Sequence, residues 1–469
     1  MLPVIAIIGS PNVGKSTLFN RLTKSRDAIV ADFPGLTRDR QYGYGKIGSI
    51  PYLVVDTGGI SGDEEGINEL MVQQTSEAMK EADILIVMVD GRAGPSASDQ
   101  HIIEITRKYS NKIWFVVNKT EGLDIDIAVS EFQNFGFSRT AAISASHGDQ
   151  VSSMMDEILK PFVEEADSQD INSSSNDESK SLSIAIIGRP NVGKSTLINR
   201  LIGEERLVVY DEPGTTRDTI KIDIQKDDEN FTFFDTAGVR RKARVRQSIE
   251  KFSVIKSMHA IEKCNVVFAV IDAAEGITEQ DISLMGLSLD RGRALVLLLN
   301  KWDGLDKEQK KNINNQIDRR LPFLDFADKH AISALHGTGV GNLLRAAKKA
   351  YGAATRNIST NLLTSELEDA VTEHAPPLVR GRRIRLRYAH QGGKNPPTIV
   401  VHGNQTERLP LAYKRYLMNR FRKRFKLQGT PVRLVFKTSD NPFKGRRNKL
   451  TPRQMRKKKR LMKFTKKKK

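Results

Sequence analysis

Two segments of the chain place glycines, a lysine and a hydroxyl residue at the spacing of a loop that cradles phosphate. The pattern GxxxxGK(S/T) spans residues 9–16 as GSPNVGKS and residues 188–195 as GRPNVGKS. An apolar run precedes each loop and a helical pattern follows it, which is the context that the motif requires. The lysine can then reach the β- and γ-phosphates of a nucleotide, and the serine after it offers a hydroxyl to Mg²⁺. A turn that binds nothing is the alternative for a single match, and the repetition argues against it.

Further motifs follow each loop in the same order. Asp56 and Asp235 end apolar runs, where a carboxylate can hold Mg²⁺ through water, and the glycines of DTGG and DTAG can bring a main-chain N–H to the γ-phosphate. Thr37 and Thr216 can add a hydroxyl to Mg²⁺. The predicted metal ligands are Ser16, Thr37, Asp56, Ser195, Thr216 and Asp235. The predicted phosphate-binding residues are Gly9, Ser10, Pro11, Asn12, Val13, Gly14, Lys15, Ser16, Thr17, Asp56, Thr57, Gly58, Gly59 and Ile60, and in the second copy Gly188, Arg189, Pro190, Asn191, Val192, Gly193, Lys194, Ser195, Thr196, Asp235, Thr236, Ala237, Gly238 and Val239.

A third pair of motifs selects the base. The order Asn-Lys-x-acidic follows an apolar run as NKTE at 118–121 and as NKWD at 300–303. A carboxylate accepts hydrogen bonds from the N1–H and the exocyclic amine of guanine, whereas a carboxylate left unpaired beside adenine is penalised. We expect the asparagine to read O6 and N7 and the lysine stem to stack on the ring. The predicted base-binding residues are Asn118, Lys119, Thr120, Glu121, Ser144 and Ala145, and Asn300, Lys301, Trp302, Asp303, Ser333 and Ala334.

All of these motifs belong to a duplicated unit. The phosphate loop, the PGxTRD segment and the DTxG motif recur at a constant offset of 179 residues. Each copy alternates near-continuous apolar runs, such as VIAIIG and DILIVMVD, with amphipathic segments such as KSTLFNRLTK. Such runs indicate parallel strands that are covered on both faces and joined by helical crossovers. The motifs then lie at the carboxyl edge of an open α/β sheet, where such sheets bind their ligands.

The order of the motifs is similar to that of the translation-factor class of GTPases. Two tandem copies followed by a short basic region resemble the bacterial ribosome-biogenesis GTPases of the Der family, also called EngA. The resemblance implies an α/β fold with two tandem P-loop GTPase domains, each a mostly parallel sheet with helices on both faces, followed by a small α+β KH-like domain. It also implies hydrolysis of GTP to GDP and phosphate at two sites, coupled to maturation of the large ribosomal subunit.

Composition and resemblance together divide the chain. The predicted parts are a first GTPase domain at 1–163, an acidic flexible linker at 164–181, a second GTPase domain at 182–353, a KH-like domain at 354–443 and a basic disordered tail at 444–469. Inside the KH-like domain we predict a helix over 361–374, strands over 382–390 and 398–401, a helix over 411–426 and a strand over 431–437. The GxxG loop that clamps nucleic-acid backbone in ordinary KH domains is absent. We therefore expect phosphate contacts from its basic residues, with a domain that only docks on the GTPase pair as the alternative.

Positive charge is concentrated in the last quarter of the chain. The whole chain has 75 Lys and Arg against 56 Asp and Glu, a net charge of +19, whereas residues 1–359 have 44 against 50. Residues 444–469 alone contain 15 basic residues and no acidic residue. A polyanion should therefore be steered to one end of the molecule. Together with the resemblance, this distribution predicts the large ribosomal subunit and its rRNA as partners.

The residue after each DxxG motif departs from Ras-like GTPases, in which a glutamine orients the attacking water. Ile60 and Val239 stand there and cannot orient water. Hydrolysis is then either slow when unaided or, as a resemblance to potassium-activated GTPases implies, helped by K⁺ that Asn12 and Asn191 hold in place of an arginine finger. On that interpretation the catalytic residues are Asn12, Lys15, Thr37, Asn191, Lys194 and Thr216. The first base site has Glu121 where the second has Asp303. The glutamate side chain is longer but keeps the carboxylate, so we still expect the first site to bind guanine.

The basic segment at 239–246 occurs in the second copy only and is either a solvated charge run or a contact that responds to the nucleotide. Cys264, the single cysteine, is expected to be a buried structural thiol. No apolar run reaches the length of about 20 residues that spans a bilayer. The expected protein is a cytoplasmic monomer that uses GTP or GDP, Mg²⁺ and K⁺ and has no membrane or DNA partner. The alternatives are a GTPase acting on tRNA or membrane, and an RNA-binding scaffold whose nucleotide sites are structural.

Overall fold

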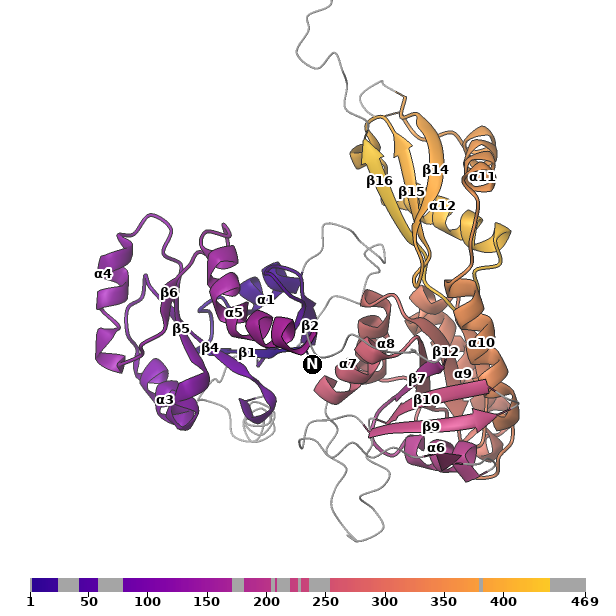
Figure 1. The fold of residues 1–469 in the computed structure, drawn as a ribbon, viewed down its shortest axis with the longest axis horizontal. Helices are drawn as coiled ribbons and strands as arrows, with labels where there is room; N and C mark the ends of the chain where they lie inside the picture. Colours follow the sequence, from indigo (N-terminus) through magenta and orange to yellow (C-terminus); the bar gives the residue numbers. More distant parts are fainter. Residues whose placement is uncertain are drawn as a thin grey trace, which may run out of the picture.

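A computed structural model of the protein describes three domains that are built around separate sheets (Figure 1). The residues that it describes are 2–23, 42–57, 79–170, 181–203, 207–208, 220–226, 229–235, 254–378 and 383–438. In this part of the chain no helix is both long and apolar enough to cross a membrane.

The first domain contains a six-stranded sheet, counted over the described residues, with the strand order β2-β3-β1-β4-β5-β6. All neighbouring strands are parallel except β2 and β3. Alternate residues of β1 face opposite sides, so that Ile5 and Ile7 pack with α1 and α5, while Ala6 packs in the cluster that contains α3. The elements are β1 Val4–Gly9, α1 Lys15–Thr23, β2 Tyr42–Gly45, β3 Tyr52–Asp56, β4 Ile84–Asp90, α3 Ala97–Thr106, β5 Ile113–Asn118, α4 Ile125–Ser130, β6 Thr140–Ala142 and α5 Val151–Asp170.

The second domain repeats this plan. Its described strands form a seven-stranded sheet in the order β13-β12-β11-β7-β10-β9-β8. Helices α6 and α10 cover one face, and α7, α8 and α9 lie in the apolar cluster of the other. The elements are β7 Leu182–Ile187, α6 Lys194–Gly203, β8 Leu207–Val208, β9 Ile220–Lys226, β10 Glu229–Asp235, α7 Val254–Lys263, β11 Val266–Asp272, α8 Glu279–Asp290, β12 Ala294–Asn300, α9 Lys307–Arg320, β13 Asp328–Ala331 and α10 Leu343–Ala354.

The prediction of two mostly parallel sheets is confirmed, with antiparallel strands added at one edge of each. Strand β2 pairs with β3 in antiparallel orientation, and β9 pairs in this way with both β10 and β8. The sequence of β9, IKIDIQK, alternates apolar and polar residues, which is the usual pattern of a strand with one solvated face. The pattern for β2, YGYG, is too short and glycine-rich to stand out.

The third domain is small and has the predicted α-β-β-α-β order. Its elements are α11 Thr360–Glu373, β14 Leu386–Gly393, β15 Thr398–Gly403, α12 Leu411–Arg424 and β16 Arg433–Thr438. The first strand differs from the predicted range 382–390, because it begins at Leu386 and continues to Gly393, where Gln391 pairs with Ile399 and Gly393 with Thr398. The Gln391 amide is satisfied by main-chain groups of residues 356 and 358, so this polar residue does not end the strand.

Several predicted segments lie partly or wholly outside the described residues. Helix α5 runs through Asp170, so the beginning of the predicted linker, residues 164–170, is helical. The rest of the linker from 171 to 180, the basic segment 239–246 and the tail 444–469 are outside the described part of the chain.

The first and second domains touch through the short edge strand β2. The Tyr44 side chain is only 3% exposed, and its hydroxyl donates a hydrogen bond of 3.1 Å to the Met258 carbonyl in α7. The Arg291 guanidinium lies 4.0 Å from the centroid of the Tyr44 ring and pairs with Glu262 at 2.6 Å. One apolar cluster continues from the first domain into the second. Cys264, which is 1% exposed, lies in this cluster, and burial raises its pKa to about 12, so the prediction of a buried thiol is confirmed.

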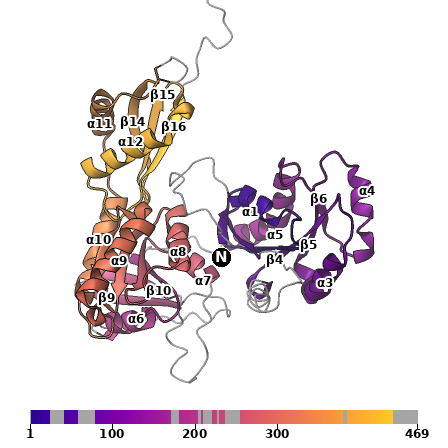
Figure 2. The ribbon, with the colours of Figure 1, turned by 180° about the vertical axis from the view of Figure 1, so that it is seen from behind.

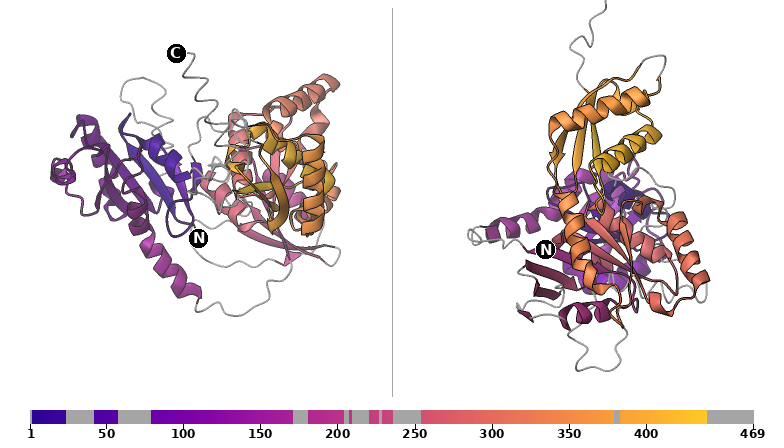
Figure 3. Two further views of the ribbon diagram at one scale, coloured as in Figure 1. Left: turned by 90° about the horizontal axis from the view of Figure 1, so that it is seen from above. Right: turned by 90° about the vertical axis from the view of Figure 1, so that its right-hand side faces the viewer.

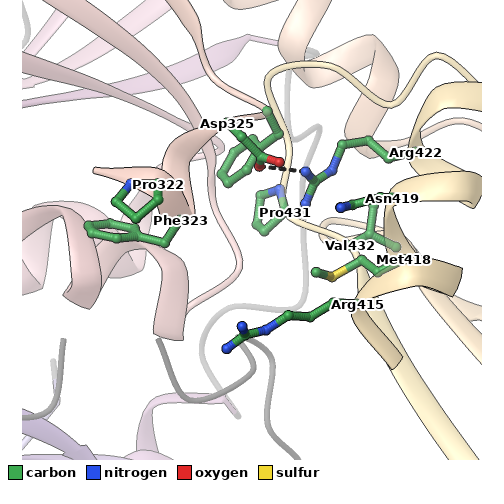
Figure 4. A pocket seen from close by; sticks show the side chains of 10 residues that line it. Pro322, Phe323, Asp325, Arg415, Met418, Asn419, Arg422, Pro431 and Val432 are labelled. Carbon is green, nitrogen blue, oxygen red and sulfur yellow. Dashed lines mark hydrogen bonds and ion pairs between the residues drawn. The ribbon is translucent and has the colours of Figure 1, made fainter. Parts of the chain in front are cut away.

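The third domain is docked on the second (Figures 2 and 3). The N–H of Leu295, at the start of β12, donates to the Gly429 carbonyl at 2.8 Å, and the N–H of Gly429 donates to the Phe326 carbonyl at 2.7 Å. The Arg422 guanidinium pairs with Asp325 at 2.5 Å and lies over the Phe326 ring (Figure 4). Gly429 has a φ of +76°, and a Cβ there would lie 2.6 Å from the Cβ of Ala350. The interface therefore requires glycine at this position.

Candidate nucleotide sites

Each phosphate loop folds around its own lysine. Lys15 and Lys194 are both 5% exposed. The Lys15 ammonium donates to the Ser10 carbonyl at 2.7 Å, and the Lys194 ammonium donates to the Arg189 carbonyl at 2.6 Å. Burial lowers the pKa of Lys15, and the nearby Asp56 carboxylate opposes that shift. The predicted lysines therefore sit at the centre of their loops, at the amino end of α1 and α6, where the helix dipole favours an anion.

The conformation of the loops explains their residue types. Gly14 and Gly193 have φ values of +103° and +97°, and a Cβ at either would lie within about 2.3 Å of an asparagine amide nitrogen. Asn12 and Asn191 are exposed and also have positive φ, +65° and +62°, a region that asparagine adopts more readily than most residues. Both predicted potassium-binding asparagines thus occupy the same special position in their loops.

Two predicted metal ligands of the first copy are in contact. The Ser16 hydroxyl donates to a carboxylate oxygen of Asp56 at 2.8 Å, because Asp56 ends β3 beside Ile7 of β1. A hydroxyl and a carboxylate oxygen are the hard ligands that Mg²⁺ takes alongside phosphate and water, so these residues fit the metal. In the second copy Asp235 ends β10 in the equivalent register, opposite Ile186 of β7.

The asparagine of each base motif ties two loops together. Asn118 and Asn300 are 2% and 3% exposed. The amide nitrogen of Asn300 donates to the Val192 carbonyl of the phosphate loop at 2.7 Å, and its oxygen accepts from the N–H of Ala334 at 2.9 Å. Asn118 makes the same two bonds, with Val13 and Ala145, at 2.7 and 2.9 Å. The sequence motif predicted only a contact with the base for Asn118 and Asn300, and it gave no sign of this bracing role.

The lysine of each base motif pairs with an aspartate that the sequence analysis did not single out. Lys119 and Lys301 both have positive φ, and their ammonium groups lie 2.6 and 2.5 Å from Asp90 and Asp272, respectively. These aspartates end β4 and β11. Burial raises the pKa of Asp90, but the Lys119 ammonium and two main-chain N–H groups outweigh that effect and lower it overall. The pairing fixes the lysine stem that we expect to stack on the base.

The acidic residues of the two base motifs differ in their partners. Glu121 is held by Arg92, whose guanidinium is 3.1 Å away, and hydrogen bonds from its own main chain and from Ser144 help to lower its pKa. Asp303 lies 3.2 Å from His336, and the Ser333 hydroxyl is the main cause of its lowered pKa. Ala274 occupies the position in the second copy that Arg92 has in the first. Both acids are thus ionised acceptors, but among the described residues only Glu121 has an arginine partner.

A second pair of missed residues anchors the phosphate loops. Asp99 and Asp281, 5% and 1% exposed, close capping boxes at the start of α3 and α8. Asp99 also accepts from the Ser10 hydroxyl at 2.7 Å, and Asp281 pairs with the Arg189 guanidinium at 3.0 Å. The patterns SASD and TEQD are capping signals that could have identified both helix starts.

The remaining predicted residues divide between described and undescribed parts of the chain. Thr120 donates to the Ile143 carbonyl, and the Trp302 N–H donates to the Ile332 carbonyl, so both base motifs are joined to the loops that contain Ser144 and Ser333. The predicted residues outside the described part are Thr37, Gly58, Gly59, Ile60, Thr216, Thr236, Ala237, Gly238 and Val239. Within the described part, no separate cluster of three or more His, Cys, Asp or Glu could hold a metal ion.

Comparison with known proteins agrees with this geometry. A family model described as "50S ribosome-binding GTPase" matches residues 4–119 and 183–301, and one described as "KH-domain-like of EngA bacterial GTPase enzymes, C-terminal" matches residues 357–437. The chain is 56% identical over 470 residues to GTPase Der of Thioalkalivibrio sulfidiphilus, with 100% of both chains covered. It is 51% identical over 498 residues to GTPase Der of Haemophilus influenzae, with 99% of both covered. The chain therefore belongs to the GTPase Der family and is a GTPase with two tandem GTPase domains and a KH-like domain.

Proposed function

We propose that the protein is a GTP-driven switch that acts in the cytoplasm in assembly of the large ribosomal subunit, in contact with its rRNA. The observation that carries the proposal is the match of both nucleotide domains to the family of 50S ribosome-binding GTPases. The charge of the KH-like domain supports it, because residues 354–443 contain 17 Lys and Arg against 6 Asp and Glu. Such a surface favours the phosphates of RNA.

We assign hydrolysis to the domains at 1–163 and 182–353 and RNA contact to the domain at 354–443 and the tail at 444–469. The nucleotide would be held by the phosphate loops and the base motifs, with Mg²⁺ at Ser16 and Asp56 and at their counterparts in the second copy. K⁺ would lie near Asn12 and Asn191, and their exposed, left-handed conformation supports this assignment. The protein would act as a monomer.

Sedimentation with purified ribosomal subunits tests the proposal. We expect the chain with a non-hydrolysable GTP analogue to sediment with large subunits and not with small subunits, and to do so less with GDP. The double substitution Lys15→Ala and Lys194→Ala is the matched control, because it should remove the nucleotide dependence. Binding should weaken as the salt concentration rises. For each tenfold increase in salt, the logarithm of the binding constant should fall by about 0.7–0.9 per phosphate contact.

Removal of the tail 444–469 should lessen that salt slope without abolishing binding. Equal binding to both subunits, or binding that ignores the nucleotide in the unsubstituted chain, would contradict the proposal.

A further inference from the structure

Helices cover one face of the sheet of the KH-like domain, and the other face carries aromatic and basic side chains. Ala389, Ile399 and Val401, all 0% exposed, pack with residues of α11 and α12. Successive residues of a strand point to opposite faces, so Tyr388, His390 and His402 lie on the other face. Helix α12 crosses in front of the strands in Figure 2 and lies behind them in Figure 1, which shows the face opposite the helices.

Three rings lie together on this second face. Tyr388 of β14 is paired directly with His402 of β15, and the two rings stack with centroids 4.4 Å apart and planes 6° apart. The His390 ring lies 5.2 Å from His402 and 6.1 Å from Tyr388. Tyr388 remains 43% exposed. Because the Tyr388 and His402 rings stack face to face across neighbouring strands, the face of the exposed Tyr388 ring that points away from His402 is available to an unpaired base, and RNA-binding proteins stack unpaired bases on exposed aromatic rings.

Positive charge borders the rings. His402 is opposite Lys437 of the edge strand β16, and Arg433 lies on the same face two rows away, opposite Thr398. The three strands contain no acidic residue. Burial, His390 and Lys437 lower the pKa of His402, so its ring is neutral near pH 7. The Nε2 atom of His402 is buried and has no hydrogen-bond partner among the described residues.

We propose that this face binds single-stranded RNA, with an unpaired base stacked on the Tyr388–His402 ring pair and backbone phosphates at Lys437 and Arg433. Lys437 and Arg433 of the edge strand can bind phosphates, and the neutral rings beside them can stack on a base. A duplex cannot use the ring pair, because its bases are already stacked and paired, and it can bind only through its phosphates. The inference rests on the proposed function for the source of the RNA and adds to it the contact surface and the single-stranded character of the ligand.

Fluorescence anisotropy of a labelled oligoadenylate of about 12 nucleotides, within the size range of single-strand sites, tests the inference on the full chain. We expect Tyr388→Ala to weaken binding by about 5- to 150-fold, the range for one stacked base. Tyr388→Phe keeps the ring and should bind normally. Because the tyrosine is uncharged, Tyr388→Ala should leave the salt slope unchanged, whereas Lys437→Ala should lessen it by about 0.7.

His374→Ala is the matched control, because the His374 ring stacks on Tyr416, from α12 on the helix-covered side, with centroids 5.1 Å apart. It should leave RNA binding unchanged, and an RNA duplex of the same length should bind the parent and Tyr388→Ala equally. An unchanged thermal unfolding curve of Tyr388→Ala, followed by circular dichroism, would show that the KH-like domain is folded.

Equal affinity of the parent and Tyr388→Ala for the oligonucleotide would overturn the inference. If Tyr388→Ala instead altered hydrolysis alone, the face would be a contact within the protein, and the inference would again be wrong. Sedimentation with large subunits is a separate readout. If the parent chain does not sediment with large subunits, the proposed function is wrong. If the parent does sediment with them and Tyr388→Ala still binds the oligonucleotide normally, only this inference is wrong.

Discussion

Replacing Asn300 by alanine should break the tie between the phosphate loop and the base site of the second GTPase domain. The substitution removes the bonds to the Val192 carbonyl and the Ala334 N–H, measured at 2.7 and 2.9 Å, from a side chain that is 3% exposed. A buried polar group left unsatisfied costs about 1–3 kcal/mol. We expect water to reach either the Val192 carbonyl or the Ala334 N–H and to leave the other group unsatisfied. A loss of about 1–3 kcal/mol then weakens GDP binding by about 5- to 150-fold, because 1.4 kcal/mol corresponds to a tenfold change in affinity.

Calorimetric titration with GDP measures this effect when Lys15→Ala disables the first site. Hydrogen exchange provides the structural readout, because the Ala334 amide should lose protection in Asn300→Ala. Asn118→Ala is the internal control, since it removes the equivalent bonds from the first domain and should leave exchange at Ala334 unchanged. A GDP affinity within twofold of the parent, with Ala334 still protected, would refute the bracing role of Asn300.

Three further predictions concern the base, the cation and the contact between the GTPase domains. Asp303→Asn, with the first site disabled by Lys15→Ala, should shift preference from GTP to xanthosine triphosphate, because the acceptor pair becomes an amide; unchanged GTP binding would show that Asp303 does not read the base. Hydrolysis should be faster in K⁺ than in Na⁺ at equal ionic strength, and Asn191→Ala should remove most of the difference; identical rates in the two salts would count against the cation site. Tyr44→Ala should loosen the contact between the first and second domains, since it removes a buried ring and its bond to the Met258 carbonyl. Small-angle scattering should then report a larger radius of gyration, and an identical profile would contradict this view of the interface.

The ends of the central strands could be predicted because each apolar run is bounded by a motif. Asp56, Asn118 and Asn300 are the last residues of their strands, as the sequence indicated. The anchoring role of Asp99 could not be predicted in this way. Its partner Ser10 is 89 residues away, and no local pattern links the two. Hydrogen bonds of this kind depend on the arrangement of complete elements in space.

The arrangement of the KH-like domain was equally hidden from the sequence. Its charge predicted an RNA-facing surface, but its contact with the second domain depends on main-chain bonds at Gly429, and a glycine in the sequence does not show which distant segment its main chain will bind. The ring group was missed because its members come from two strands and meet only when Tyr388 pairs with His402. Pairing register is set by the whole sheet, so a single strand does not reveal it.

Strand β12 joins the second base site to the KH-like domain. Its last residue is Asn300, and its second residue, Leu295, donates a main-chain hydrogen bond to Gly429 of the KH-like domain. All seven residues are buried, and the strand is about 20 Å long at 3.3 Å per residue. Strand β11 pairs with all seven residues, and β13 pairs with Val296–Leu299 on the other side. A close-packed strand resists compression and bending. We therefore expect a shift of Asn300 along the strand axis to be passed on to the main-chain contact between Leu295 and Gly429.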